Sequence, residues 1–186
     1  MNPAVAVPQL LVLLLIGVEI YAGRLRRAEA ERKDRGSLYV IYGLIALGYW
    51  AAFWLWARRP PPPRLGDWSL WAGATIAVLG LALRLWSVIT LGQYFTYVVK
   101  VTPDQKVVDT GPYRLIRHPS YAGALLAGVG IGLSLGYALA PVIIGATSLA
   151  AYVIRILVEE SALAEGIGEP YRRYMGRTRR LIPFVW

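Results

Sequence analysis

Long apolar runs are the feature that most limits what this 186-residue chain can fold into. A helix of about 20 apolar residues crosses the hydrocarbon core of a bilayer, and only helices and closed barrels satisfy their backbone hydrogen bonds there. Hydrophobic residues make up 56% of the sequence. We therefore predict an all-α polytopic membrane protein with about five transmembrane helices, over residues 3–23, 38–57, 68–91, 119–135 and 137–160.

The whole chain, residues 1–186, is expected to form a single integral membrane domain. Residues 1–91 would supply three transmembrane helices, and residues 92–186 a C-terminal helical hairpin with a cytosolic cap and tail. The first apolar run lacks a basic leader and a small-residue cleavage site, so we expect it to be retained and not removed as a signal peptide. Four consecutive prolines at 60–63 cannot continue a helix, and they predict a stiff connector outside the membrane.

Positive charge is concentrated in particular connections. The formal net charge is +9, and most of the 20 lysines and arginines lie in residues 24–36, 92–118 and 161–186. Five spans place these segments on one side. Because basic residues accumulate in cytoplasmic loops, we expect an outward N-terminus and a cytoplasmic C-terminus. The basic surface suits anionic membrane lipids, and we expect no nucleic-acid partner. The short chain and its Ala/Arg/Leu-rich composition favour a bacterial inner membrane.

Few side chains in the sequence are suited to redox or metal chemistry. The chain has no cysteine, so it offers no disulfide, thiolate nucleophile or cysteine-bound metal. Its one histidine, His118, argues against a histidine-based zinc or haem site. We therefore expect no bound metal.

Ionisable residues gather at one end of the predicted hairpin. His118 precedes one arm and Arg155 lies near the end of the other, at nearly equal distances in sequence from the turn at Gly136. At about 1.5 Å per helical residue, both arms return to the same depth. Arg155 and Glu159 share a helix face, whereas Glu160 points about 100° away. Ionisable groups at membrane depth are candidates for function; the alternative is a solvated helix end with a snorkelling arginine.

The first turn after His118 is suited to an anionic group. Pro119 fits the first position of a helix, and Ser120 follows it where backbone N–H groups are exposed. A ligand carboxylate could dock there, with Tyr113 and Tyr121 as aromatic surface. The alternative is a histidine that serves only as an interfacial residue.

Two further patterns have both a structural and a functional interpretation. Glu19 and Arg84 are charges within predicted spans, and we expect them to pair, with substrate contact as the alternative. A row of small residues spaced by four favours close helix packing, with a groove for an acyl or isoprenoid chain as the alternative. The row consists of Ser120, Ala124, Gly128, Gly132 and Gly136.

The segment 92–118 is long for a connection between helices. Connections of this length are usually functional or disordered. Its aromatic and β-branched residues predict an ordered cap over the mouth of the hairpin. Together with the tail, this cap would roof a cytosolic pocket.

Three motifs in the second half of the chain resemble the isoprenylcysteine carboxyl methyltransferase family, which is related to phospholipid methyltransferases. They are QKVVDTGPYRLIRHPSYAG at 105–123, EESAL at 159–163 and EPYRRYMGRTRRLIP at 169–183. The resemblance implies an integral membrane enzyme that uses S-adenosyl-L-methionine without a Rossmann domain. Its acceptor would be lipophilic, prenylated or lipid-like, and would reach the site through a gap between helices.

The resemblance also implies roles for individual residues. Arg155 would bind the acceptor carboxylate and position it, with no residue assigned as a certain catalyst and no metal. The cofactor-binding residues would be Lys100, Gln105, Lys106, Val107, Val108, Tyr113, His118, Pro119, Ser120, Tyr121 and Glu159.

Methyl transfer from a sulfonium to a carboxylate fits a site with one histidine and no cysteine. Such an in-line displacement needs no general base, and catalysis can rest on holding two ligands in line. Three alternatives remain open from the residues. An amine-headed phospholipid acceptor would require a base such as Glu160. A sterol-type reductase would use Lys106 and Arg117 for the extra phosphate of NADPH. A non-catalytic membrane scaffold would use none of these residues.

Overall fold

The computed structural model describes residues 2–24, 35–58, 64–95 and 107–183. Its α-helices are α1 (Pro3–Arg24), α2 (Arg35–Ala57), α3 (Trp68–Leu91), α4 (Pro119–Ser134), α5 (Leu139–Gly166) and α6 (Glu169–Arg177), with short 3-10 helices η1 (Gly92–Tyr94) and η2 (Gly111–Arg114). The described residues form no strand, only an isolated bridge between Ile116 and Arg179. The prediction of an all-α membrane protein is confirmed.

Among the described residues, four helices are long and apolar enough to cross a membrane: α1, α2 from Tyr39, α3 with η1, and α5. The fifth predicted span is present as α4, but this apolar helix has 16 residues. At about 1.5 Å per residue it is shorter than the roughly 30 Å hydrocarbon core. In contrast, α5 has 28 residues and continues to Gly166, beyond the predicted end at 160.

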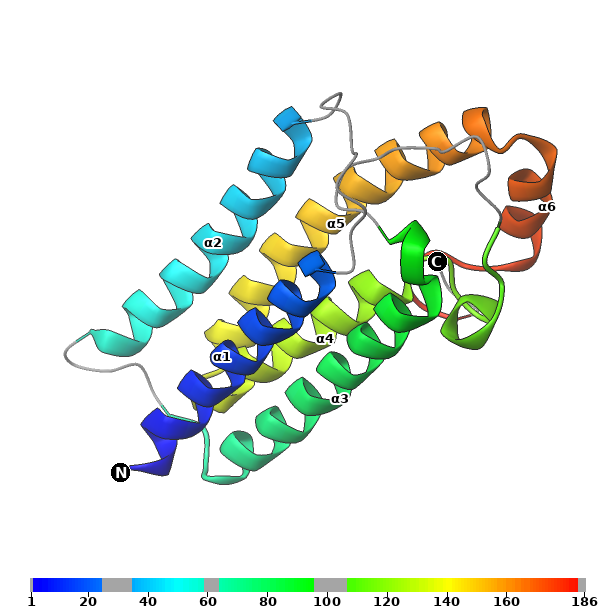
Figure 1. Ribbon diagram of the computed structural model, residues 1–186. Coiled ribbons are helices and arrows are strands. Elements are labelled where there is room, and N and C mark those ends of the chain that lie inside the picture. The colour runs from blue at the N-terminus through cyan, green and yellow to red at the C-terminus, as the bar shows by residue number, and fades with distance from the viewer. Residues whose placement is uncertain (1, 25–34, 59–63, 96–106, 184–186) are drawn as a thin grey trace.

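Figure 1 shows α1 to α5 running side by side, with α6 beyond the far end of α5. The start of α1, the end of α2, the start of α3 and the α4–α5 turn lie at one end of the bundle. The start of α4, the end of α5 and α6 lie toward the other end. The functional motifs of the sequence therefore gather at one end of the helices.

Helices α3 and α4 pack so closely that their backbones are in contact at glycine positions. A Cβ atom added at Gly73 or Gly80 of α3 would lie under 3.0 Å from backbone atoms of α4, and the same holds for Gly123 and Gly130 of α4 against α3. Small residues at such positions let membrane helices pack closely. These glycines of α4 do not belong to the row of small residues singled out in the sequence.

The predicted row contributes to packing against α5, as the favoured interpretation expected. An added Cβ at Gly132 would lie under 3.0 Å from the backbone of Pro141, and one at Gly128 would lie 3.1 Å from Ile144 Cγ2. Gly136 forms the turn before α5 with a φ of 84°, a conformation that favours glycine. Two members of the row, Ser120 and Ala124, line a cavity instead.

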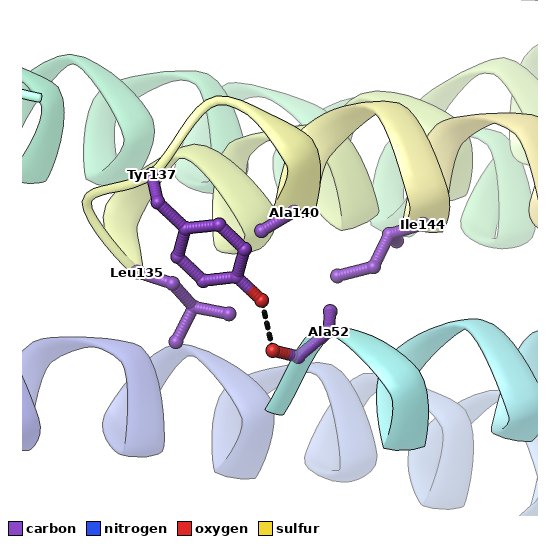
Figure 2. Close-up of a cluster of buried hydrophobic side chains, with 5 residues drawn as sticks. All are labelled: Ala52, Leu135, Tyr137, Ala140 and Ile144. Atoms are coloured by element: carbon purple, nitrogen blue, oxygen red, sulfur yellow. Dashed lines mark hydrogen bonds between the residues drawn. The ribbon is translucent and has the colours of Figure 1, made fainter. Parts of the chain in front are cut away.

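The hairpin is anchored at its turn by a buried cluster shown in Figure 2. Ala52 of α2 packs there with Leu135, Tyr137, Ala140 and Ile144. The Tyr137 hydroxyl donates a hydrogen bond to the carbonyl oxygen of Ala52. This satisfies a buried phenol and fixes α2 against the α4–α5 turn, at the end of the bundle opposite the functional motifs.

At the other end, the C-terminal tail returns to the segment before α4. The backbone N–H groups of Arg117 and His118 donate to the carbonyl oxygens of Arg179 and Arg180, at 2.7 and 3.0 Å. The turn before α6 contains Gly168, with a φ of 76°. This return path brings the third sequence motif beside the first.

Candidate active site

A cavity of about 580 Å³ lies where the motifs meet, and residues of α1 to α6 line it. This volume is within the range of about 300–1,000 Å³ that is typical of small-molecule sites. Its lining combines aromatic, charged and apolar side chains.

A column of stacked rings runs along one wall of the cavity. The rings of His118 and Tyr121 have centroids 5.7 Å apart, and those of Tyr121 and Tyr152 have centroids 5.2 Å apart, with interplanar angles near 20°. The Tyr121 hydroxyl donates to Glu159 Oε2 at 2.8 Å. The structure thus brings together His118, Tyr121 and Glu159, which the sequence placed in one site.

Behind this wall, Glu160 is the centre of a buried ion-pair network. Its carboxylate accepts from Arg117 Nε at 2.7 Å and from Arg180 Nε at 2.9 Å, and it lies 3.3 Å from His118 Nε2. Because a carboxylate only accepts hydrogen bonds, His118 donates through Nε2. Glu160 does not line the cavity, whereas Glu159 does. As predicted, the side chains of Glu159 and Glu160 point in different directions. Glu160 therefore contacts His118, Arg117 and Arg180 and holds them in place.

The Arg117 side chain belongs to the same ion-pair network. Besides Glu160, its guanidinium donates to the carbonyl oxygens of Met175 and Thr178. These contacts attach the segment before α4 to the end of α6. Sequence reasoning missed this role for Arg117 and Arg180, because their partner is distant in sequence and no local pattern identifies it.

Arg155 lies on the cavity wall one helical turn before Glu159, as its spacing predicted. Only 3% of its surface is exposed. The planar fork of a guanidinium matches both oxygens of a carboxylate, so arginine is the residue type suited to a ligand carboxylate at this position.

The cap over the cavity is formed by η2 and α6. Five residues of this region line the cavity: Val107, Val108, Tyr113, Tyr171 and Tyr174. The Tyr174 hydroxyl donates to the carbonyl oxygen of Tyr113 at 2.7 Å. Burial raises the pKa of all three phenols above the usual value near 10, so these rings are uncharged at neutral pH. The described parts of the predicted roof are confirmed.

Glu19 and Arg84 form the predicted ion pair, and they also line the cavity. Arg84 Nε donates to Glu19 Oε1 at 2.5 Å, and Nη2 donates to Oε2 at 2.7 Å. Arg84 Nη1 donates in addition to the Ser120 hydroxyl at 2.8 Å and to the Ser120 carbonyl oxygen at 3.1 Å. The Ser120 side chain is therefore bound to α3, a contact that the sequence did not predict.

The rest of the wall is apolar and comes from the two N-terminal helices. Leu15, Ile16 and Ile20 of α1 face the same cavity as Ile41 and Ile45 of α2. The cavity thus joins a polar end at the motifs to an apolar region between membrane helices.

Of the predicted site residues, Lys100, Gln105 and Lys106 lie outside the described residues. Pro119 is buried at the first position of α4 and does not line the cavity. Within the described part of the chain, no group of three or more His, Cys, Asp or Glu side chains is arranged to hold a metal ion.

Comparison with known families matches the central part of the chain. The sequence model for the isoprenylcysteine carboxyl methyltransferase (ICMT) family matches residues 73–165, which is half of the chain. The match covers most of α3, all of α4 and nearly all of α5, and so includes His118, Arg155 and Glu159.

Several curated proteins and a solved structure are similar to this chain. Protein-S-isoprenylcysteine O-methyltransferase B of Arabidopsis thaliana is 33% identical over 61% of this chain and 58% of its own length. Protein-S-isoprenylcysteine O-methyltransferase of Tribolium castaneum is 30% identical over 77% of this chain and 52% of its own length. The structure of the eukaryotic intramembrane Ras methyltransferase ICMT without a monobody superposes with a TM-score of 0.63 at 30% identity, over 77% of this chain and 52% of that one. This chain therefore spans little more than half the length of these relatives.

Proposed function

The chain belongs to the isoprenylcysteine carboxyl methyltransferase family, and we propose that it transfers a methyl group from S-adenosylmethionine to the carboxylate of an isoprenylcysteine-like acceptor at the membrane. One observation carries the proposal: the motif side chains, a buried arginine and an apolar wall line the same cavity. Each of these parts suits a different portion of the two ligands.

The motif end of the cavity suits the methyl donor. Its aromatic walls, Tyr113, Tyr171 and Tyr174, stay uncharged, and the nearby Glu159 carboxylate adds negative charge. Aromatic faces and carboxylates stabilise cations, and the sulfonium of S-adenosylmethionine is a cation. His118 and Tyr121 complete this end of the site through their stacked rings.

The rest of the cavity suits the acceptor. Arg155 would bind the acceptor carboxylate through its guanidinium. The aliphatic side chains of α1 and α2 would cover the isoprenoid chain, since burial of apolar surface is favourable. We propose that the isoprenoid group enters from the bilayer between α1 and α2, because both helices expose large apolar side chains, such as Leu13 of α1 and Leu47 of α2.

In this reaction the main task of the protein is to position the methyl donor and the acceptor. When bound, S-adenosylmethionine supplies a methyl group on a positively charged sulfur, which leaves as a neutral thioether as a carboxylate oxygen forms the new bond. The acceptor carboxylate is ionised at neutral pH, so no protein group has to remove a proton. Arg155 and the aromatic wall would hold the two ligands in line, an effect worth on the order of several kcal/mol.

The geometry does not favour the other two enzymatic functions. An amine acceptor needs a general base, but the Glu160 carboxylate faces Arg117, Arg180 and His118, away from the cavity. The extra phosphate of NADPH needs cations, but the Arg117 guanidinium is bound to Glu160 and to backbone carbonyl oxygens. Lys106, the other residue of that alternative, lies outside the described residues.

We also propose an orientation in the membrane from the distribution of charge. The basic connections and tail would face the cytoplasm with the motif end of the bundle, and the N-terminus would face outward. Anionic lipids are the expected partners of this basic side. A bacterial inner membrane remains the proposed location.

The first experiment measures donor binding and turnover with protein purified in mild detergent. Calorimetry would compare S-adenosylmethionine with NADPH, using the wild type and a His118→Ala/Glu159→Ala double variant. We expect micromolar binding of S-adenosylmethionine that the double variant loses, followed by transfer of labelled methyl to an N-acylated S-farnesylcysteine. Binding of NADPH alone would indicate that the protein is a sterol-type reductase. Binding of neither ligand by folded protein would indicate a non-catalytic membrane scaffold.

A further inference from the structure

The cavity ends part-way along the helices. The lining residues that lie farthest from the motif end come from four helices: Leu15 of α1, Tyr49 of α2, Ala124 of α4 and Ser148 of α5. One helical turn beyond the last two, Gly128 and Ile144 do not line the cavity. The helices thus agree on the depth at which the cavity stops.

The side chain of Tyr49 lies across this inner end. A Cβ atom added at Gly128 would lie 3.2 Å from the Tyr49 hydroxyl oxygen and 3.9 Å from its Cζ atom. The tip of a ring carried by α2 therefore comes into contact range of the α4 backbone. Glycine at position 128 leaves the space that this contact needs. The Tyr49 ring spans the gap between α2 and α4 at the level where the cavity stops.

Packed side chains fill the bundle beyond the Tyr49 ring. Tyr49 packs against a buried cluster of Leu11, Ala77 and Ile131, and also against the cluster at the hairpin turn in Figure 2. Among the described residues, no buried member of either cluster lines the cavity. Close-packed cores resist the insertion of extra atoms. A hydrocarbon group that reaches the ring therefore has no further space in this direction.

We propose that Tyr49 limits the length of the hydrocarbon group that the cavity accepts, and that it is therefore a specificity-determining residue for the acceptor. This inference rests on the proposed function, in which the acceptor carboxylate lies at Arg155. Ser148 lies about two helical turns further into the cavity on the same helix, or about 10 Å at 1.5 Å per residue. The polar end of the acceptor is held at one level and the ring closes the cavity at the other, so the distance between them selects the length of the isoprenoid group.

Tyr49→Ala should make longer acceptors better substrates relative to shorter ones. The substitution removes a phenol ring from the end of the cavity, and the space left suits about one further five-carbon isoprene unit. Methyl-transfer assays would use N-acylated S-geranyl-, S-farnesyl- and S-geranylgeranylcysteine. Because even one methylene in an apolar pocket changes kcat/KM by about 10- to 200-fold, the geranylgeranyl-to-farnesyl ratio of kcat/KM should rise roughly tenfold.

Other variants separate the length of the cavity from its stability. Tyr49→Phe keeps the ring and should keep the wild-type ratio, whereas Tyr49→Trp enlarges the ring and should lower it. Tyr49→Leu preserves more packing than alanine and should give a smaller rise. The matched control is Trp50→Ala, which removes a large aromatic side chain that is 63% exposed and does not line the cavity. Thermal unfolding in detergent would show that each variant is folded.

Several outcomes would overturn the inference. One is an unchanged ratio in folded Tyr49→Ala and Tyr49→Leu, including an equal loss of kcat/KM for all three acceptors, which would indicate a purely structural role. Another is an altered ratio in Tyr49→Phe, because selectivity would then depend on the hydroxyl. A third is the same rise in Trp50→Ala. Absence of methyl transfer by the wild type to any acceptor would overturn the proposed function, whereas wild-type transfer with unchanged ratios in the variants would overturn this inference alone.

Discussion

At the scale of single residues, neighbouring acids on one helix have different tasks. Glu159 reaches the cavity and accepts from Tyr121, whereas Glu160 points behind the wall and binds Arg117 and Arg180. The difference arises because successive residues on a helix point about 100° apart. Substitution of Glu159 should therefore affect ligand contact, whereas substitution of Glu160 should affect structural support.

Arg155→Gln should impair acceptor use while donor binding is retained. Loss of a charged hydrogen-bond partner for the acceptor carboxylate costs about 1.5–3 kcal/mol, so kcat/KM for the acceptor should fall by roughly 10- to 100-fold. Steady-state methyl-transfer assays and donor calorimetry would measure the two effects separately. Arg155→Lys, which keeps the charge, should retain more activity. Unchanged turnover of a lipid acceptor by Arg155→Gln would refute the assigned role.

Glu160→Gln should destabilise the protein, because two arginines would lose their shared counter-charge in a buried site. Breaking such a pair costs about 3–5 kcal/mol, and the amide recovers part of it, so we expect a loss of about 3 kcal/mol. Thermal unfolding in detergent would measure it, with the exposed Glu165→Gln as control. A variant as stable as the wild type but with an altered pH dependence of kcat would instead indicate that Glu160 is a general base.

At the scale of elements, the closest helix contact depends on glycine. Gly73 and Gly80 of α3 face Gly123 and Gly130 of α4 with no space for a side chain. Arg84 and Ser120 belong to the same two helices, so this contact sets the distance across which they bond. Helix packing therefore determines the geometry of one cavity wall.

Gly80→Ala should separate α3 from α4, because its Cβ would lie under 3.0 Å from the backbone nitrogen of Ala127. Overpacking of this kind costs about 1–3 kcal/mol. The matched control is Gly17→Ala in α1, where an added Cβ meets nothing within 4 Å. That change should be neutral or stabilise the helix by up to about 1 kcal/mol. Equal thermal unfolding of the two variants would contradict close packing of α3 on α4.

The cap formed by η2 and α6 is expected to be sensitive to alkali. Burial raises the folded-state pKa of Tyr113, Tyr171 and Tyr174 above the unfolded value of about 10. Their contribution to stability is therefore complete below about pH 10 and is lost as pH rises through the folded-state pKa. Thermal unfolding between neutral and strongly alkaline pH should show a decline above about pH 10.

The matched variant for this effect is Tyr174→Phe. It removes one titrating phenol together with its hydrogen bond to the Tyr113 carbonyl oxygen. We expect lower stability at neutral pH by about 1 kcal/mol, but a shallower decline in alkali than in the wild type. Parallel curves for the two proteins would show that this phenol does not contribute to the alkaline transition.

At the scale of the whole molecule, the motifs, α6 and the tail gather at one end of the bundle (Figure 1). The ion pairs of Glu160 attach the end of α5 to the segment before α4 and to the tail. The cavity connects this end with the apolar faces of α1 and α2. Such a shape suits reaction between a water-soluble donor and an acceptor held in the bilayer.

The proposed orientation can be tested directly because the chain contains no cysteine. Arg64→Cys would place a thiol in the connection before α3, and Arg173→Cys would place one on the exposed face of α6. In spheroplasts, a membrane-impermeant maleimide should label the first variant, and should label the second only after lysis. The reverse pattern would invert the proposed topology.

Much of the helical arrangement was predictable from the sequence, because it depends on local patterns. Long apolar runs gave the positions of the helices, although α4 is shorter and α5 longer than predicted. Equal hairpin arms placed His118 beside the end of α5, and the i, i+4 spacing placed Arg155 and Glu159 on one wall. The expected pairing of Glu19 with Arg84 followed from the scarcity of charge within spans.

Other features were decided only by the tertiary structure. The sequence shows Arg117 and Arg180 as two of many basic residues, and the small residues of α3 as ordinary helix positions. Their roles arise because helix packing and the return of the tail bring together groups that are 20 to 61 residues apart. The sequence by itself determined which segments enter the membrane and which side chains share a helix face, since both follow from hydrophobicity and helical periodicity. Apart from the pair of Glu19 with Arg84, the partners of the buried charges became visible only in the folded molecule, because pairing depends on contacts between distant segments.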